Sequence, residues 1–302
     1  MTALLPFVSI CLLTYNRAGQ LGLSIESLLA QSHHDFELII NDDNSPDNTE
    51  AVCREFERRD ARVRYCKNST NLRYAGNQNA AIERAKSDYV AIVHDGDIYR
   101  TDLIEKWTRA LVESPSAALV FNDLEAMDLE GNVVNCFTHP YPPLVPGRSL
   151  AIEMVQRTDS PIFGIVMVRR SCVLAVGPFD LRLPTLADVD MWLRLLIRFD
   201  AVYLKEPLLK IGAREADHHN RIGNWKIKAQ HELIYQLALE RLFPTPSEES
   251  LRVIAVCRQM VLQHRLLWLG ILLKRMAWRE LWHGLCYCTR SLPRVRHEAQ
   301  RG

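Results

Sequence analysis

Short apolar runs alternate with longer amphipathic stretches along the first 125 residues of the chain. The apolar runs, rich in β-branched residues, predict strands at Phe7–Leu13, Phe36–Ile40, Val63–Cys66, Tyr89–Val93 and Ala117–Phe121. The stretches between them have helical spacing, at about Gln20–Ala30, Thr49–Arg59, Ala75–Lys86 and Asp102–Glu113. Strands that alternate with helices are typical of the α/β class, so we expect a mostly parallel central sheet flanked by helices.

The middle of the chain is less regular. The section Leu124–Pro161 is rich in turns, and within it Pro140–Gly147 (PYPPLVPG) predicts a mobile loop. Beyond it we expect a strand at Phe163–Arg169, a short helix near Ser171–Val176 and an amphipathic helix at Asp188–Arg198.

The last part of the chain reads as helical from Trp225 to near Ser291, with a break at Phe243–Ser247. We therefore expect two parts, a α/β domain over residues 1–223 and a helical C-terminal extension over residues 224–302.

Three polar clusters follow predicted strands, at Thr14–Arg17, Asn41–Thr49 and His94–Asp97. Ligands bind to open α/β sheets beyond the carboxyl ends of their strands, and the fold would bring these three clusters to one such edge. This convergence is the main sequence signal for a binding site.

The sequence Asp95-Gly96-Asp97 places two carboxylates on a tight turn. Carboxylate oxygens are the ligands that Mg²⁺ and Mn²⁺ prefer, and the intervening glycine permits a close backbone approach. A metal held there would neutralise a leaving diphosphate. The alternative is a solvated turn, because Asp-Gly is a common turn dipeptide.

Two further groups of residues lie at the same predicted edge. Asp42 and Asp43 end the second strand, where one carboxylate can face a ligand while the other holds the turn, or where both serve a helix cap. For Asp47 and Asn48 we favour the capping role. Hydroxyl, aromatic and amide contacts to a base or phosphate could come from the loop residues Thr14, Tyr15, Asn16 and Arg17.

Two candidates lie later in the chain. Asp188 opens a helix together with Asp190, where it could remove a proton from a hydroxyl or simply complement the helix dipole. His218 and His219 lie in a polar loop, where one could ligate a metal, although a solvated surface pair is the plainer interpretation.

Composition narrows the class of protein. Hydrophobic residues make up 48% of the chain and the net charge is +1, which supports a folded protein and no nucleic-acid partner. Eight scattered cysteines without a CxxC pair favour a reducing, cytoplasmic location. No apolar run reaches the ~18 residues of a membrane span, and we expect no signal peptide.

The C-terminal tail is basic. From Cys257 onward it contains nine Lys or Arg against two Asp or Glu, and three tryptophans, Trp268, Trp278 and Trp282. On an uninterrupted helix one face would carry Arg258, Arg265, Arg279 and Arg290. Such a face could dock peripherally on the inner, anionic surface of the cytoplasmic membrane, whereas a buried helical core is the alternative.

Taken in order, these segments resemble the family 2 glycosyltransferases of the GT-A fold. Residues 7–49 look like the family's opening signature, and residues 71–97 (NLRYAGNQNAAIERAKSDYVAIVHDGD) look like its approach to the DxD motif. Residues 176–195 (VGPFDLRLPTLADVDMWLRL) look like its acceptor-side segment.

The resemblance implies a role for each candidate. The nucleotide of a nucleotide-sugar donor would be held by Thr14, Asn16 and Asp43, and Asp95 would contact ribose or diphosphate. Asp97 would coordinate Mn²⁺ or Mg²⁺, with His218 or His219 as a further ligand, and Asp188 would be the general base. The reaction implied is inverting transfer of one sugar to a hydroxyl of a glycan or lipid-linked acceptor, in bacterial surface polysaccharide or glycoconjugate synthesis.

The sequence departs from the family pattern at four places. Asn44 replaces a common Gly, Ile98 a common Asp, and Ala187 the Glu that usually precedes the base. The segment Gln263–Trp268 has the wrong spacing for the QxxRW motif of processive synthases, so we expect single-sugar transfer.

Two other classes remain open. Ala187 is the only support for a catalytically silent relative that binds nucleotide or glycan. A sugar nucleotidyltransferase would share the fold class, but TYNRAGQ is not the glycine-rich basic loop of those enzymes. A dinucleotide oxidoreductase is disfavoured because no GxGxxG follows the first strand.

Overall fold

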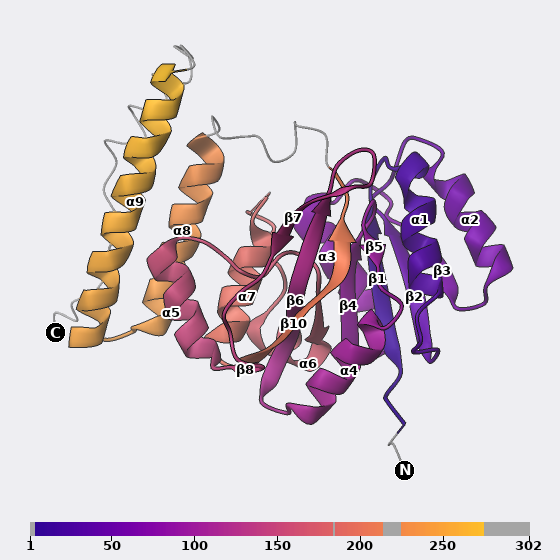
Figure 1. Ribbon diagram of the computed structural model, residues 1–302, viewed down its shortest axis with the longest axis horizontal. Helices are drawn as coiled ribbons and strands as arrows, with labels where there is room; N and C mark the ends of the chain where they lie inside the picture. The colour runs from indigo at the N-terminus through magenta and orange to yellow at the C-terminus, as the bar shows by residue number, and fades with distance from the viewer. Residues whose placement is uncertain (1–3, 184, 214–224, 275–302) are drawn as a thin grey trace. The chain divides into compact units, whose positions relative to one another are not determined.

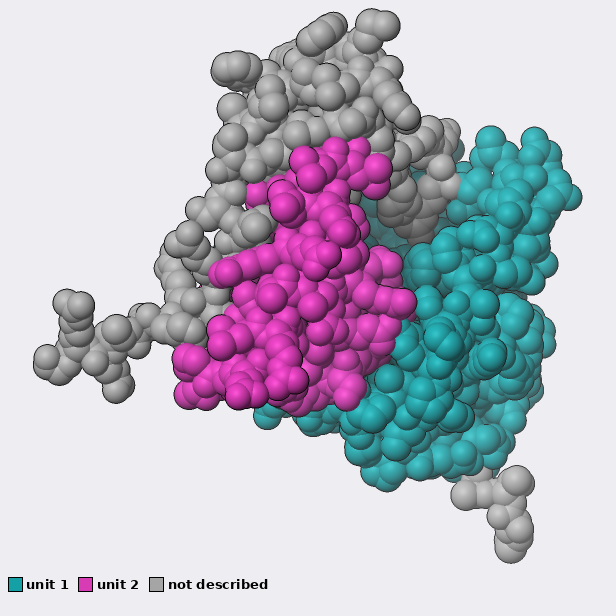
Figure 2. Space-filling model, turned by 60° about the vertical axis from the view of Figure 1, so that its left-hand side comes forward, with its two compact units in different colours: residues 1–147, 162–213 teal, residues 148–161, 214–302 magenta. Residues whose placement is uncertain are grey.

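The computed structural model describes residues 4–183, 185–213 and 225–274. The chain divides into two compact units, a first unit of residues 1–147 and 162–213 and a second unit of residues 148–161 and 214–302 (Figure 2). The second unit therefore includes a segment, 148–161, that the sequence-based division assigns to the first domain. The predicted boundary at residue 223 lies outside the described residues and stays a prediction.

The first unit is built on a ten-stranded mixed sheet in the order β3-β2-β1-β4-β9-β6-β10-β5, with β7 paired to β6 and β8 to β10, all counted within the described residues (Figure 1). The strands are β1 (Val8–Thr14), β2 (Phe36–Asp42), β3 (Val63–Lys67), β4 (Tyr89–His94), β5 (Ile98–Tyr99), β6 (Ala117–Met127), β7 (Val133–Phe137), β8 (Leu144–Val145), β9 (Val166–Arg169) and β10 (Asp200–Ile211). The long ladders among β1 to β4 and between β6 and β10 are parallel, whereas β9 runs antiparallel to β4 and β6.

Helices cover both faces of this sheet. They are α1 (Ala18–Leu29), α2 (Thr49–Arg59), α3 (Arg73–Arg84), α4 (Leu103–Glu113), α6 (Arg170–Val176) and α7 (Ala187–Leu196). Alternate β1 residues such as Ile10 and Leu12 pack in one core cluster with Leu21 of α1. Cys11 points to the opposite face, where its thiol donates to the Ala81 carbonyl of α3. Every β1 residue is buried, as expected for a central strand covered on both faces.

The fold class and most of the first elements are confirmed. The five strands predicted in this region and the helices α2 and α4 begin at the residues predicted or within one of them. The strand β10 was missed, because Lys205, Glu206 and Pro207 interrupt its apolar run and its register shifts around Pro207. The section taken as turn-rich contains β7, β8 and the helix α5 (Gly147–Arg157), and β8 lies inside the predicted mobile loop.

The second unit contains α5 from residue 148 onward, α8 (Trp225–Leu242) and α9 (Glu248–Lys274). The predicted break in the helical region is confirmed between α8 and α9. Arg265 of α9 is only 3% exposed, and its guanidinium makes two hydrogen bonds to the Glu232 carboxylate of α8, one of 2.9 Å. Placing Arg265 on a basic membrane-facing surface was therefore wrong, because it is buried and neutralised inside this unit.

Arg258, also expected on this basic face, lies in α9 and is half-buried. Arg279, Arg290, Trp278 and Trp282 lie outside the described residues. None of the described helices has a stretch long and apolar enough to span a bilayer.

Candidate active site

The carboxyl ends of three neighbouring strands meet at one edge of the sheet. In the parallel ladders Thr14 of β1 lies beside Asp42 of β2, and Leu13 lies beside His94 of β4. The backbone N–H of Asp43 donates to the Thr14 carbonyl at 3.0 Å, and that of Asp95 donates to the Leu13 carbonyl at 3.3 Å. The expected convergence of the three polar clusters is thus present.

The loop after β1 is partly exposed at this edge. Tyr15 is 46% exposed, and Asn16, which has a left-handed φ of 56°, donates its N–H to Ser45 Oγ at 2.8 Å. Thr14 is buried, and its Oγ1 has no hydrogen-bond partner among the described residues. Arg17 precedes α1 and donates to the Gln20 side chain. The loop thus presents an aromatic face, an amide and a buried hydroxyl.

Asp42 and Asp43 accept hydrogen bonds from different segments. Asp42 is fully buried and accepts hydrogen bonds from Ser45 and, at 2.6 Å, from the Tyr65 hydroxyl. Burial and this hydrogen bond raise the pKa of Tyr65, so the phenol stays a donor. Asp43 accepts its hydrogen bonds on Oδ1 only, from Asn68 at 2.9 Å and from the Leu72 N–H at 2.8 Å. Asp42 therefore holds the turn, whereas Asp43 holds the start of α3 at the edge of the site.

Two other residues of this loop, Asn44 and Asp47, have structural roles. Asn44 has a φ of 64°, which confirms that it tolerates the left-handed position where the family has Gly. Asp47 accepts hydrogen bonds from the N–H of Ala18 at 3.0 Å and from Thr49. Burial acts to raise the pKa of Asp47, but the hydrogen bonds from Thr49 and Ala18 outweigh it and lower that pKa, in keeping with the capping role favoured for Asp47.

The Asp95-Gly96-Asp97 turn follows β4 directly. Gly96 has a φ of 78°, a conformation that favours glycine, and Asp97 is only 1% exposed while Asp95 is half-buried. Asp97 Oδ1 accepts the N–H of Gly212, just beyond β10, at 3.0 Å. A Cβ on Gly212 would lie 2.1 Å from the Gly96 carbonyl oxygen, so the two backbones are in direct contact.

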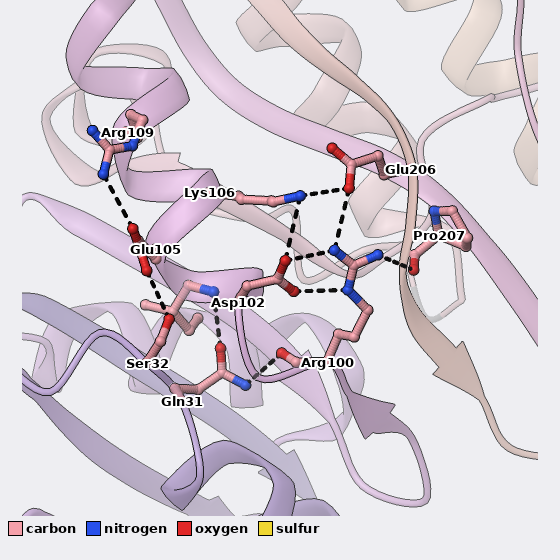
Figure 3. Close-up of polar contacts among 10 residues, drawn as sticks. Gln31, Ser32, Arg100, Asp102, Glu105, Lys106, Arg109, Glu206 and Pro207 are labelled. Atoms are coloured by element: carbon pink, nitrogen blue, oxygen red, sulfur yellow. Dashed lines mark hydrogen bonds and ion pairs between the residues drawn. The ribbon is translucent and has the colours of Figure 1, made fainter.

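Helix α1 and Gln31, just beyond its end, hydrogen-bond to the DxD turn and the residues after it. The Ser24 hydroxyl donates to the Asp97 carbonyl at 2.8 Å, and the Ser27 hydroxyl accepts the Tyr99 N–H at 3.2 Å. The Gln31 amide donates to the Arg100 carbonyl at 2.7 Å (Figure 3). Since α1 begins at the Thr14–Arg17 loop, one helix connects two of the polar clusters.

An ion-pair network continues from the same segment (Figure 3). The Arg100 guanidinium pairs with Asp102 at 2.5 Å and with Glu206 at 3.2 Å, and Lys106 pairs with both carboxylates. The Arg100 guanidinium lowers the pKa of Asp102 to about 2. These contacts join the chain after the DxD turn to β10, the strand that Gly212 follows.

Asp188 lies in the first turn of α7 and is half-buried. Its Oδ2 accepts a hydrogen bond from the Tyr74 hydroxyl of α3 at 3.2 Å. The Tyr74 ring meets the His94 ring edge-on, with centroids 6.0 Å apart. Asp190, by contrast, is 2% exposed and pairs with Arg194 at 2.8 Å, so it is a structural carboxylate.

The described residues supply two carboxylates at the DxD turn, Asp95 and Asp97. No group of three or more His, Cys, Asp or Glu side chains suited to a metal is found within the described ranges. Two carboxylates fit Mg²⁺ or Mn²⁺, because such sites take their remaining ligands from water and substrate phosphates. His218 and His219 lie outside the described residues.

Sequence reasoning missed several residues at this edge. Tyr74 and His94 stand within the segments quoted for the family resemblance, but nothing in their spacing indicated that they would meet at Asp188. Gly212 gave no signal at all, since β10 itself was not predicted. Ser24 is a buried polar residue on the inner face of an amphipathic helix, which is the one pattern that could have singled it out.

Residues 9–130 match the family model described as glycosyl transferase family 2. This segment is therefore a family 2 glycosyltransferase domain. The chain is 29% identical over 243 residues to TuaG of Bacillus subtilis (strain 168), a protein named for teichuronic acid biosynthesis. The alignment covers 80% of this chain and 92% of TuaG. The chain is 28% identical to the glycosyltransferase MJ1057 of Methanocaldococcus jannaschii, over 76% of this chain and 78% of that one.

Solved structures show the same GT-A fold for this glycosyltransferase. S. aureus TarS 1–349 in complex with UDP-GlcNAc aligns with a TM-score of 0.70 at 14% identity, covering 92% of this chain and 79% of that one. The mannosyltransferase PcManGT of Pyrobaculum calidifontis, in complex with GDP-Man and Mn²⁺, aligns with a TM-score of 0.58 at 12% identity, covering 95% and 76%. At these identities the likeness concerns the fold alone.

Proposed function

We propose that this glycosyltransferase transfers a single sugar from a nucleotide-sugar donor to an acceptor hydroxyl, with inversion and with the help of a divalent metal. The observation that carries the proposal is the placement of Asp188 and the DxD turn at one end of the sheet, linked through Tyr74 and His94. A carboxylate on a helix can serve as a general base. A pair of carboxylates on a turn can serve a metal that binds a diphosphate.

The donor would lie across the loops after β1, β2 and β4. In this proposal Thr14, Tyr15, Asn16, Arg17 and Asp43 hold the nucleotide. The buried hydroxyl of Thr14, the exposed ring of Tyr15 and the one-sided hydrogen bonding of Asp43 support it, since each leaves a group for a ligand.

Asp97 would hold Mn²⁺ or Mg²⁺, with His218 or His219 as a further ligand, and Asp95 would contact the ribose or diphosphate of the donor. The bound metal supplies neutralisation of charge on the diphosphate leaving group. For this the turn must be rigid, and the hydrogen bonds of Asp97 to Gly212 and Ser24 support that rigidity. TarS in complex with UDP-GlcNAc and PcManGT with GDP-Man and Mn²⁺ make a nucleotide sugar and a divalent ion the natural ligands to test.

Asp188 would act as the general base. Its carboxylate would take the proton of the acceptor hydroxyl as that oxygen attacks the anomeric carbon and the bond to the nucleoside diphosphate breaks. A positioned base contributes about 10²–10⁴-fold to such a step. The names of relatives in teichuronic acid synthesis and in transfer to a diphosphate-undecaprenol glycan support a glycan or lipid-linked acceptor in bacterial polysaccharide synthesis.

The test of this proposal compares the wild type with Asp188→Asn. The amide keeps the shape of the side chain but cannot accept a proton, so we expect kcat for transfer to fall by about 10²–10⁴-fold while nucleotide affinity is unchanged. The matched control is Asp60→Asn, a half-buried aspartate just after α2 that pairs with Arg62 at 2.7 Å. NMR of the product from an α-linked donor should show a β-linkage, and a retained α-linkage would refute inversion.

A further inference from the structure

One cluster of side chains meets around Gly164, in the segment that leads into β9. A Cβ placed on Gly164 would lie 2.6 Å from the Tyr74 hydroxyl, 2.8 Å from Cε1 of His94 and 3.3 Å from Oδ2 of Asp188. The first two distances are shorter than any side chain tolerates. Glycine at this position is therefore what allows the three side chains to meet.

The members of this cluster come from separate parts of the first unit. Tyr74 lies in the first turn of α3, His94 ends β4, and Asp188 lies in the first turn of α7. The start of α3 is fixed in turn, because the Leu72 N–H donates to Asp43. The backbone of His94 is fixed as well, since its N–H and its carbonyl both hydrogen-bond to the Tyr99 hydroxyl, at 2.9 and 2.7 Å. Hydrogen bonds thus fix both the start of α3, which carries Tyr74, and the backbone of His94 beside it.

We propose that Tyr74 is a positioning residue for the Asp188 carboxylate, and that the missing side chain of Gly164 leaves room for the Tyr74 hydroxyl to reach that carboxylate. The hydroxyl of Tyr74 donates to Oδ2, while the Val189 N–H donates to Oδ1 at 2.9 Å. Two donors on the two oxygens fix the plane of the carboxylate, which a helix terminus alone leaves free to rotate. This proposal rests on the proposed role of Asp188 as base.

A tyrosine hydroxyl and a basic side chain affect a carboxylate differently. A hydroxyl orients the carboxylate but brings no positive charge. An arginine in its place would hold Asp188 as Arg194 holds Asp190, at 2.8 Å. That arrangement stabilises an ionised carboxylate strongly and makes it a poorer proton acceptor.

The experiment measures kcat, the KM for donor and the nucleoside diphosphate Kd for Tyr74→Phe and Gly164→Ala. Tyr74→Phe keeps the ring against His94 and removes only the hydroxyl, so we expect kcat to fall by about 10-fold with KM and Kd unchanged. Gly164→Ala should lower kcat by about 100-fold, because its methyl group forces the cluster apart. In the double variant the loss should be smaller than the product of the two, since removal of the hydroxyl relieves the closest contact.

The matched control is Tyr89→Phe, which removes a hydroxyl at the other end of β4, where it accepts a 3.1 Å hydrogen bond from Arg169. We expect wild-type kcat for this variant. A Tyr74→Phe enzyme with wild-type kcat, beside an inactive Asp188→Asn, would overturn the positioning role alone. A loss of nucleotide affinity and melting temperature in step with kcat would also overturn it, as a purely structural effect. A fully active Asp188→Asn would instead remove the proposed base and the positioning role with it.

Discussion

Adding one methyl group at Gly212 should disable the DxD turn. The Cβ of Gly212→Ala would lie 2.1 Å from the Gly96 carbonyl oxygen and 3.1 Å from its carbon, whereas ordinary contacts start at 3.4 Å. Both partners are backbone, so no side chain can rotate away. The two segments must separate by roughly 1 Å, and overpacking of this kind costs about 1–3 kcal/mol of folding free energy.

The separation should weaken metal binding at the DxD turn more than it lowers the stability of the fold. Gly212 also donates its N–H to Asp97 Oδ1 at 3.0 Å, so the shift removes the hydrogen bond that orients this carboxylate. A misplacement of about 1 Å at a reacting centre can cost about 10²-fold in rate. We therefore expect a loss of about 100-fold in kcat, a higher Mn²⁺ concentration for half-maximal rate, and a melting temperature lower by roughly 3–10 °C.

The assay is nucleoside diphosphate release titrated with Mn²⁺, with thermal unfolding measured alongside. Gly22→Ala in α1 is the matched control, because a Cβ there meets nothing within 4 Å. In a helix interior this change should raise stability by about 0.5–1 kcal/mol and leave the metal titration unchanged. A Gly212→Ala enzyme with the metal dependence and rate of the wild type would refute the reasoning.

Two further predictions concern ion pairs. Arg265→Met should destabilise the second unit by about 3–5 kcal/mol, since it leaves Glu232, 16% exposed at its side chain, without its buried partner. Denaturant unfolding checks this, and adding Glu232→Gln should recover part of the loss. The folded pKa of Asp102, about 2, lies below its ordinary value, so its pairing with Arg100 stabilises the fold above about pH 4. That contribution of about 1 kcal/mol should vanish as the pH falls towards 2, and Asp102→Asn should show no such loss between pH 6 and pH 2.5.

The sequence could predict the parts of the fold that depend on short-range pattern. The β1 to β4 strands and α1 to α4 follow from apolar runs separated by helical spacing, and the shared edge of their loops follows from parallel topology. The role of Asn44 in a left-handed turn was likewise readable from its residue type. The edge of the sheet that carries the candidate site was therefore predictable.

The rest depends on contacts between distant segments. The strand β10 contains a proline and charged residues because its register shifts there, so its pattern does not resemble a buried strand. Gly164 and Gly212 matter only through the atoms that approach them, and no local pattern reports such an approach. Arg265 was misplaced for the same reason, since its partner Glu232 lies on another helix. Helical spacing indicates a face but not what covers it.

Release of free nucleoside diphosphate from a panel of UDP-, dTDP- and GDP-sugars tests the central claim most directly. The wild type would be assayed with Mn²⁺, with Mg²⁺ and with EDTA, beside Asp97→Asn. We expect slow turnover of one donor that requires a divalent ion and is lost in Asp97→Asn. No turnover of any donor by a folded protein that binds nucleotide would contradict the account and indicate a nucleotide-binding relative without transfer activity.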